Sequence, residues 1–279
     1  MQKLEESWIL TDGTLISWIP VGFATVCSAF GPRKLRRYIC KPPPIPVVKP
    51  AMFPPADFLD FDQTDHASLF SSDAPVWSAI SEINAYLTAR LDAVEGDLIQ
   101  GNVDPRAVIG ERVYLAPGAT VEANAIIKGP AWIGKGTTVR SGAYVRENVI
   151  VGEGCTLGNS SEFKNCLLFN GCEVPHFNYV GDSILGYKAH LGAGVICSNV
   201  RLDRENVRVK SATGYLDTGL RKFGAIIGDR TEVGCNSVLS PGTILGRDCI
   251  LYPLTSWQGI LGDRQIVKTQ SASKVVARH

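Results

Sequence analysis

An apolar side chain recurs at every sixth position through much of the second half of the chain. The first series is Ile109, Leu115, Val121, Ile127, Ile133, Val139, Val145, Val151, Leu157, Phe163 and Phe169. The spacing resumes in another phase at Leu185, Leu191 and Cys197 and, after a long insertion, at Ile227, Val233, Leu239, Leu245, Leu251 and Trp257. A period of six matches neither the α-helix, at about 3.6, nor the alternation of a β-strand.

Three hexads per turn make a triangular coil of short parallel strands. The apolar residue of each hexad points inward, and the small residue that often follows it, such as Gly110, Gly134 or Gly152, turns the corner. The sequence therefore predicts an all-β, left-handed parallel β-helix over residues 102–266. Its handedness is an exception to the usual right-handed crossover, and the hexad pattern is what indicates it.

The residues outside the coil divide into three parts. Residues 1–50 form an apolar and proline-rich N-terminal extension, and residues 267–279 form a tail. Between the extension and the coil, residues 51–101 read as a helical cap. Its helix carries Trp77, Ile80, Ile83, Leu87 and Leu91 on one face, and we expect it to cover an end of the coil.

Composition excludes several classes of function. Lys and Arg number 28 against 27 Asp and Glu, so no global field favours nucleic acid. Eight cysteines without framework spacing favour free thiols in the cytoplasm. The apolar stretch 14–30 contains Pro20 and is short for a membrane span, so a packed segment is favoured over an anchor. Peripheral contact with a membrane remains an alternative.

A β-helix has a packed interior, so its function must lie outside it. Two interruptions of the pattern are therefore of interest. One is the phase change around residues 173–183, which contains His176. The other is the insertion 198–225, where cations outnumber carboxylates and would attract a phosphate. Its cations are Arg201, Arg204, Arg208, Lys210, Arg221 and Lys222.

The run "GNSSEFKNCLLFNGCEVPHFNYVGDSILGYKAHLGAGVICSN" (158–199) carries three motifs. They are GN-x-x-E-x-K, then H-x-x-Y-x-GD, then LGAG followed by an Asn. This run resembles the acetyltransferase domain of bifunctional N-acetylglucosamine-1-phosphate uridylyltransferase/glucosamine-1-phosphate acetyltransferases, over roughly residues 102–266. The resemblance implies an acetyl-CoA-dependent N-acetyltransferase of an amino-sugar 1-phosphate, in the synthesis of UDP-N-acetylglucosamine or a related cell-envelope precursor.

The resemblance also implies roles for individual residues. His176 would be the general base, with Asn199 and Glu162 positioning the reacting groups. A second set would bind the sugar phosphate: Arg146, Lys164, Tyr179 and His190. A third set would line the acetyl-CoA groove between subunits of a homotrimer: Ala193, Cys235 and Pro253. No metal is expected. Neutral imidazole suits a base that works near neutral pH, and Arg with Lys suits a phosphate.

Some positions depart from the family's pattern. His190 stands where the family usually has Asn, and Val200 stands where it has Tyr. The family's following lysine has no clear partner, although Arg204 or Lys210 would substitute. These differences leave the amino sugar open, galactosamine 1-phosphate included. Nothing before Asn102 resembles the family's Gly-rich nucleotide loop, so we expect no nucleotidyltransferase domain in this chain.

Three other functions are alternatives. An acyl-carrier-protein-dependent acyltransferase of the lipid A type shares the coil and a catalytic histidine. A zinc-dependent carbonic anhydrase on the same coil needs three converging histidines, and only His176 and His190 lie within it. A non-catalytic scaffold would explain His190 and Val200.

Overall fold

The computed structural model describes residues 53–211 and 214–269, together with short strands nearer the N-terminus. In that N-terminal unit, β1 (Ile9–Thr11) pairs antiparallel with β2 (Thr14–Ile16), and β3 (Pro20–Val21) with β4 (Ala24–Thr25). The rest of the apolar stretch and the proline-rich segment lie outside the described residues. No helix in the described part of the chain is long and apolar enough to cross a bilayer.

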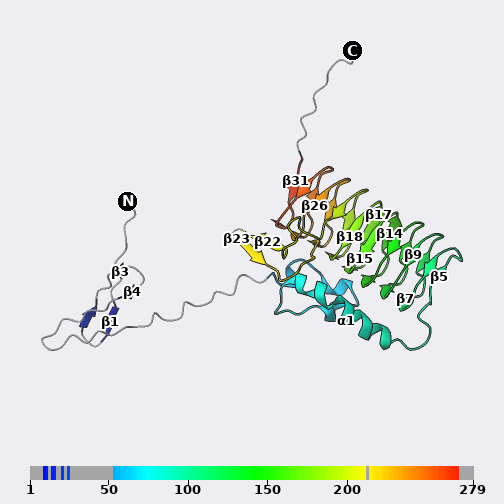
Figure 1. Cartoon of the computed structure of the whole chain (residues 1–279), viewed down its shortest axis with the longest axis horizontal. Coiled ribbons are helices and arrows are strands. Elements are labelled where there is room, and N and C mark those ends of the chain that lie inside the picture. The colour runs from blue at the N-terminus through cyan, green and yellow to red at the C-terminus, as the bar shows by residue number, and fades with distance from the viewer. Residues whose placement is uncertain are drawn as a thin grey trace, which may run out of the picture. The chain divides into compact units, whose positions relative to one another are not determined.

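The second unit is a coil whose turns each add one short strand to each of three parallel sheets (Figure 1). The capped sheet contains β7 (Val113–Leu115), β10 (Ala131–Ile133), β13 (Val149–Val151), β16 (Cys166–Leu168), β19 (Ile184–Leu185), β24 (Ala225–Ile227), β27 (Thr243–Leu245) and β30 (Ile260–Leu261). The second sheet contains β5 (Asn102–Val103), β8 (Thr120–Val121), β11 (Thr138–Val139), β14 (Thr156–Asn159), β17 (Glu173–His176), β20 (His190–Leu191), β25 (Glu232–Val233), β28 (Ile250–Leu251) and β31 (Ile266–Val267). The third sheet contains β6 (Val108–Ile109), β9 (Ile126–Ile127), β12 (Tyr144–Val145), β15 (Glu162–Lys164), β18 (Tyr179–Gly181), β21 (Ile196–Cys197), β26 (Val238–Leu239) and β29 (Ser256–Trp257). This confirms the predicted left-handed parallel β-helix.

The hexad residues fill the interior of the coil, as predicted, with one exception. Residues of both series, such as Leu115, Phe163 and Leu245, are fully buried in a single apolar cluster. The prediction is wrong for Phe169, whose ring lies outside the wall and contacts Phe61 and Phe70 of the cap at 6.3 and 6.0 Å. Leu168 takes the inward place instead.

The phase of the hexads changes at one corner only, the one between the third and capped sheets. There Phe163 is followed inward by Leu168, and Val180 by Leu185, five positions on in each case. The long insertion leaves at the same corner, between β21 and β24. At the other two corners the inward residues stay six apart throughout. The prediction that the coil breaks to present His176 is therefore wrong, because the inward residues on either side of it, Val174 and Val180, keep the spacing of six.

The cap consists of four short 3₁₀ segments and one helix. They are η1 (Pro55–Asp57), η2 (Phe61–Gln63), η3 (Ala67–Leu69), η4 (Val76–Ser78) and α1 (Ala79–Asp92). The predicted face is buried, from Trp77 to Leu91. It packs along the outer side of the capped sheet, against Ile150, Leu167 and Ile184, and not over an end of the coil (Figure 1). The reason is that these strands are apolar on both faces and need cover outside as well as inside.

The insertion forms an antiparallel hairpin of β22 (Arg208–Ser211) and β23 (Gly214–Asp217). Its roots are apolar: Val207, Val209 and Phe223 are fully buried with the cap, and the Phe223 ring lies 6.2 Å from that of Trp77. The hairpin is thereby fixed to the coil by hydrophobic packing.

Candidate active site

Polar residues gather on the outer face of the third sheet where β12, β15 and β18 lie side by side. Strand alternation turns Phe163 inward, and Glu162 and Lys164 outward. Arg146 directly follows β12 and is level with Lys164 on the next strand. The Arg146 guanidinium donates to Glu162 Oε1 at 2.9 Å and to Glu147 Oε1 at 3.2 Å. The predicted phosphate ligands thus stand together, with Arg146 held by two carboxylates.

Asp182 is the centre of this group, although the sequence analysis assigned it no role. Its side chain is buried, and its carboxylate accepts hydrogen bonds from the amides of Asn165, at 2.9 Å, and Asn199. Lys164 Nζ lies 3.7 Å from Asp182 Oδ2 and is itself largely shielded from solvent. A buried carboxylate with charge-assisted contacts orients the groups around it. Asp182 belongs to the "GD" pair that ends the H-x-x-Y-x-GD motif, and that was the available signal.

Tyr179 and Asn199 meet above the same carboxylate. The Asn199 amide donates to Tyr179 Oη at 3.2 Å as well as to Asp182. Burial, with the nearby Asp182 charge, raises the pKa of the Tyr179 hydroxyl. Gly181 makes this meeting sterically feasible, since a Cβ there would lie 2.6 Å from Tyr179 Oη and 2.8 Å from Asn199 Nδ2.

The corner between the second and third sheets carries a file of equivalent residues, here called the histidine corner. Its members are Asn159, His176, Ala193, Cys235 and Pro253. One hydrogen bond repeats along it: the residue after each member donates its N–H to the carbonyl of the member before, from Phe177 to Asn159, Gly194 to His176, Asn236 to Ala193 and Leu254 to Cys235. The structure therefore brings the predicted base and the three predicted cofactor residues into one file.

Asn178 fixes the backbone of this corner at His176. It is buried, its Oδ1 accepts from the backbone N–H of His176 at 3.0 Å, and its Nδ2 donates to the Gly192 carbonyl at 2.7 Å. The His176 ring is exposed and makes no hydrogen bond among the described residues. The sequence reasoning missed Asn178, because its side chain serves the backbone and no charge or motif marks that role.

His190 lies apart from the polar residues on the third sheet, here called the third-sheet group (Arg146, Glu162, Lys164, Tyr179, Asp182 and Asn199). It stands on β20 of the second sheet, where its Nδ1 is 2.6 Å from Glu232 Oε2 of the neighbouring strand. The imidazoles of His176 and His190 contact neither each other nor the Lys164–Asp182 group within the described residues. A single chain therefore assembles Arg146, Glu162, Lys164, Tyr179 and Asn199, and holds the two histidines on other surfaces.

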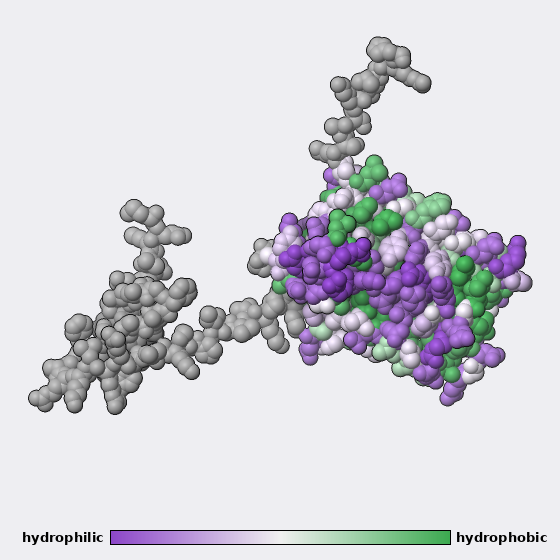
Figure 2. Space-filling model, in the orientation of Figure 1, coloured by the Kyte–Doolittle hydropathy of each residue, from purple (hydrophilic) through white to green (hydrophobic). Residues whose placement is uncertain are grey.

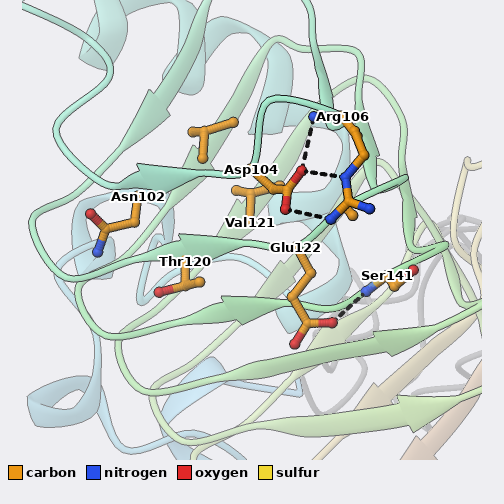
Figure 3. Close-up of a pocket in the computed structure, with 9 residues that line it drawn as sticks. Asn102, Asp104, Arg106, Thr120, Val121, Glu122 and Ser141 are labelled. Atoms are coloured by element: carbon orange, nitrogen blue, oxygen red, sulfur yellow. Dashed lines mark hydrogen bonds and ion pairs between the residues drawn. The ribbon is translucent and has the colours of Figure 1, made fainter.

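A hollow of about 450 Å³ lies farther along the second sheet, toward the first turns of the coil (Figure 3). Its charged groups are already satisfied: Arg106 donates twice to Asp104, at 3.0 Å each, and Glu122 accepts from the Ser141 N–H at 2.8 Å. The hollow offers a ligand few unpaired polar groups, so the third-sheet group and the histidine corner are the better candidate.

Comparison with known proteins finds relatives over part of the chain. A bifunctional GlmU protein from Methanococcus maripaludis (strain C7) is 46% identical over 175 residues, which are 63% of this chain and 41% of that protein. Over these 175 residues the chain is similar to part of that GlmU protein. The GMPPB C-terminal domain model matches residues 127–215. A bifunctional sugar-1-phosphate nucleotidylyltransferase/acetyltransferase from Sulfurisphaera tokodaii is 35% identical over 97 residues, 35% of this chain and 24% of that one.

The chain spans about two fifths of the length of the Methanococcus protein. Among solved structures, it is similar to the acetyltransferase domain of PglB from Neisseria gonorrhoeae, determined with acetyl coenzyme A. That likeness has a TM-score of 0.22 and 15% identity, and it covers 70% of this chain and 76% of the other.

Proposed function

We propose that the chain is an acetyl-CoA-dependent N-acetyltransferase that acts on an amino-sugar 1-phosphate. The observation that carries this proposal is the placement of Arg146 and Lys164 side by side, braced by carboxylates, on the sheet next to the histidine corner. A guanidinium and an ammonium held in fixed positions suit a sugar phosphate. Homology to GlmU over this part of the chain supports the same reaction class.

In this proposal the sugar phosphate lies against Arg146 and Lys164, and acetyl-CoA lies along the histidine corner past Ala193, Cys235 and Pro253. The sugar amine attacks the thioester carbon, so that an N–C bond forms and the C–S bond breaks. His176 takes a proton from the amine and returns it to the departing thiolate. The Ala193 N–H, which has no partner among the described residues, would donate to the oxyanion.

The proposal includes a homotrimer with sites between subunits. In one chain the His176 ring and the Lys164–Asp182 group lie on different surfaces, and a site shared between copies would unite them. The exposed apolar residues of the second and third sheets, such as Ile126 and Ile250 at 38% and 40% exposure, support contact between copies.

The direct test is release of free thiol when the protein is mixed with acetyl-CoA and a panel of amino-sugar 1-phosphates. We expect thiol release with glucosamine 1-phosphate or galactosamine 1-phosphate, matched by an equal amount of N-acetylated sugar. If no member of the panel is acetylated by folded oligomer, the enzyme proposal fails and the scaffold alternative replaces it.

A further inference from the structure

A groove of about 550 Å³ runs between the insertion and the last strands of the third sheet. The insertion contributes Arg201, Leu202, Arg208 and Tyr215 to its walls, and the sheet contributes Val238 and Ser240. Figure 2 shows strongly hydrophilic surface on this side of the coil with apolar surface next to it. None of the residues discussed as the candidate active site lines this groove.

The walls combine a flat apolar surface with a cation. The Tyr215 ring is 59% exposed, and the Arg208 guanidinium lies 5.5 Å from its centre. Leu202 and Val238 are also exposed. Arg201 is paired with Asp203, whereas Arg208 has no carboxylate within ion-pair distance among the described residues. An exposed aromatic ring beside an unpaired guanidinium suits a planar heterocycle that carries a phosphate.

The groove is in line with the phosphate-binding group. The strand register places Lys164, Gly181, Ser198, Ser240 and Gln258 in one file, and the last three line the groove. Ser198 is two strands from Lys164, about 10 Å at the usual spacing. This file follows the edge of the third sheet opposite the histidine corner. The groove is thus an extension of the sugar-phosphate site and not of the proposed acetyl-CoA path.

We infer that this groove binds the nucleotide part of the substrate, so that the chain accepts a nucleoside-diphosphate amino sugar. The inference rests on the proposed function and extends its substrate from the amino-sugar 1-phosphate to the nucleotide-linked amino sugar. The base would stack on Tyr215, Arg208 would bind the phosphate nearest the nucleoside, and Lys164 with Arg146 would bind the phosphate attached to the sugar. The hydroxyls of Ser198 and Ser240 and the amide of Gln258 line the same groove as hydrogen-bonding groups.

Binding can be measured without catalysis, by calorimetry with UDP and GDP on the wild type, Arg208→Gln and Tyr215→Leu. We expect UDP or GDP to bind, and each substitution to raise its Kd at least tenfold. Arg264→Gln is the control, because Arg264 is an exposed arginine of the coil that does not line the groove. It should change the Kd less than twofold.

Three results would overturn the inference. The first is a Kd for UDP and GDP that is unchanged in both groove variants, and the second is pyrophosphate that binds as tightly as UDP and GDP. The third is that the two substitutions weaken the binding of adenosine 3′,5′-bisphosphate alone. The third result would mean that the groove binds acetyl-CoA. Acetylation provides the second readout, since kcat/KM should be at least tenfold higher for the nucleotide-linked amino sugar, and both variants should abolish this preference. Acetylation of the bare 1-phosphate without nucleotide binding would refute the groove alone, whereas nucleotide binding without any acetylation would refute the proposed function alone.

Discussion

At the scale of single residues, His176 is the position on which the proposed chemistry depends. Replacing it with alanine removes the base and leaves the corner intact, because Asn178 bonds the backbone of residue 176 and not its ring. We expect kcat to fall about 100-fold or more, with little change in KM for the sugar. Steady-state thiol release measures both constants. A kcat within a few-fold of the wild type would exclude His176 as the base.

Lys164 should act through binding. Substituting methionine removes the ammonium beside Asp182 and weakens the hold on the sugar phosphate. A lost charge-assisted contact is worth about 1.5–3 kcal/mol, so KM should rise roughly ten- to 100-fold. Lys135→Met is the control, because Lys135 is an exposed lysine between β10 of the capped sheet and β11 of the second sheet, away from the group. Equal increases in KM for the two substitutions would mean that the sugar phosphate responds only to the net charge of the protein and not to the position of Lys164.

His66 makes the cap sensitive to acid. The residue is buried between Tyr86 and Trp132, and burial, aided by the Arg90 charge, lowers its pKa from 6.5 to about 4. Between these two values His66 is protonated in the unfolded chain and neutral in the folded chain. The free energy of unfolding therefore falls as the pH drops from 6.5 toward 4. The loss should reach about 2–3 kcal/mol near the lower pKa. Urea unfolding at a series of pH values should show this loss in the wild type, and a smaller one in His66→Gln. Identical profiles would mean that other groups cause the loss.

At the scale of elements, Phe169 should join the cap to the coil. Its ring is fully buried against the cap and contributes nothing to the coil's interior. Phe169→Ala should cost about 3–5 kcal/mol, the usual loss for a buried Phe. The control is Phe177→Ala, since that ring is 60% exposed and its loss should cost little. Chemical denaturation of both variants tests this, and a small loss for Phe169→Ala would mean that the cap docks without it.

The elements also show what a sequence can reveal of this molecule. The coil was predictable, because each strand places one apolar residue in the interior. The apolar residue therefore recurs every six residues in the sequence. The shift after Phe163 was not, because Phe169 is apolar for a different reason, namely its contact with the cap. The residues grouped on the third sheet followed from the motifs. The role of Asp182 did not, since it depends on three side chains from other strands converging on one carboxylate.

At the scale of the whole molecule, we expect a homotrimer. The uncovered sheets carry Val108 and Ile126 on one face and Ile250 and Ile266 on the other, all exposed in the single chain. Light scattering should give three times the mass of the chain, and Ile126→Glu should weaken the assembly. Leu202→Glu, at an exposed position of the insertion, should not. A monomer that turns over substrate would contradict the trimer and the shared site together.

Every irregular spacing between inward residues lies at the corner between the third and capped sheets. This restricts where the length of such a chain can vary. Length can be gained or lost at that edge without moving the histidine corner, because each following turn re-enters the coil through the same two regular corners. The insertion that forms the β22–β23 hairpin is one such gain, and it leaves the files before and after it in register. This edge is where foreign loops, or whole domains, can be grafted while the proposed base and cofactor path keep their geometry.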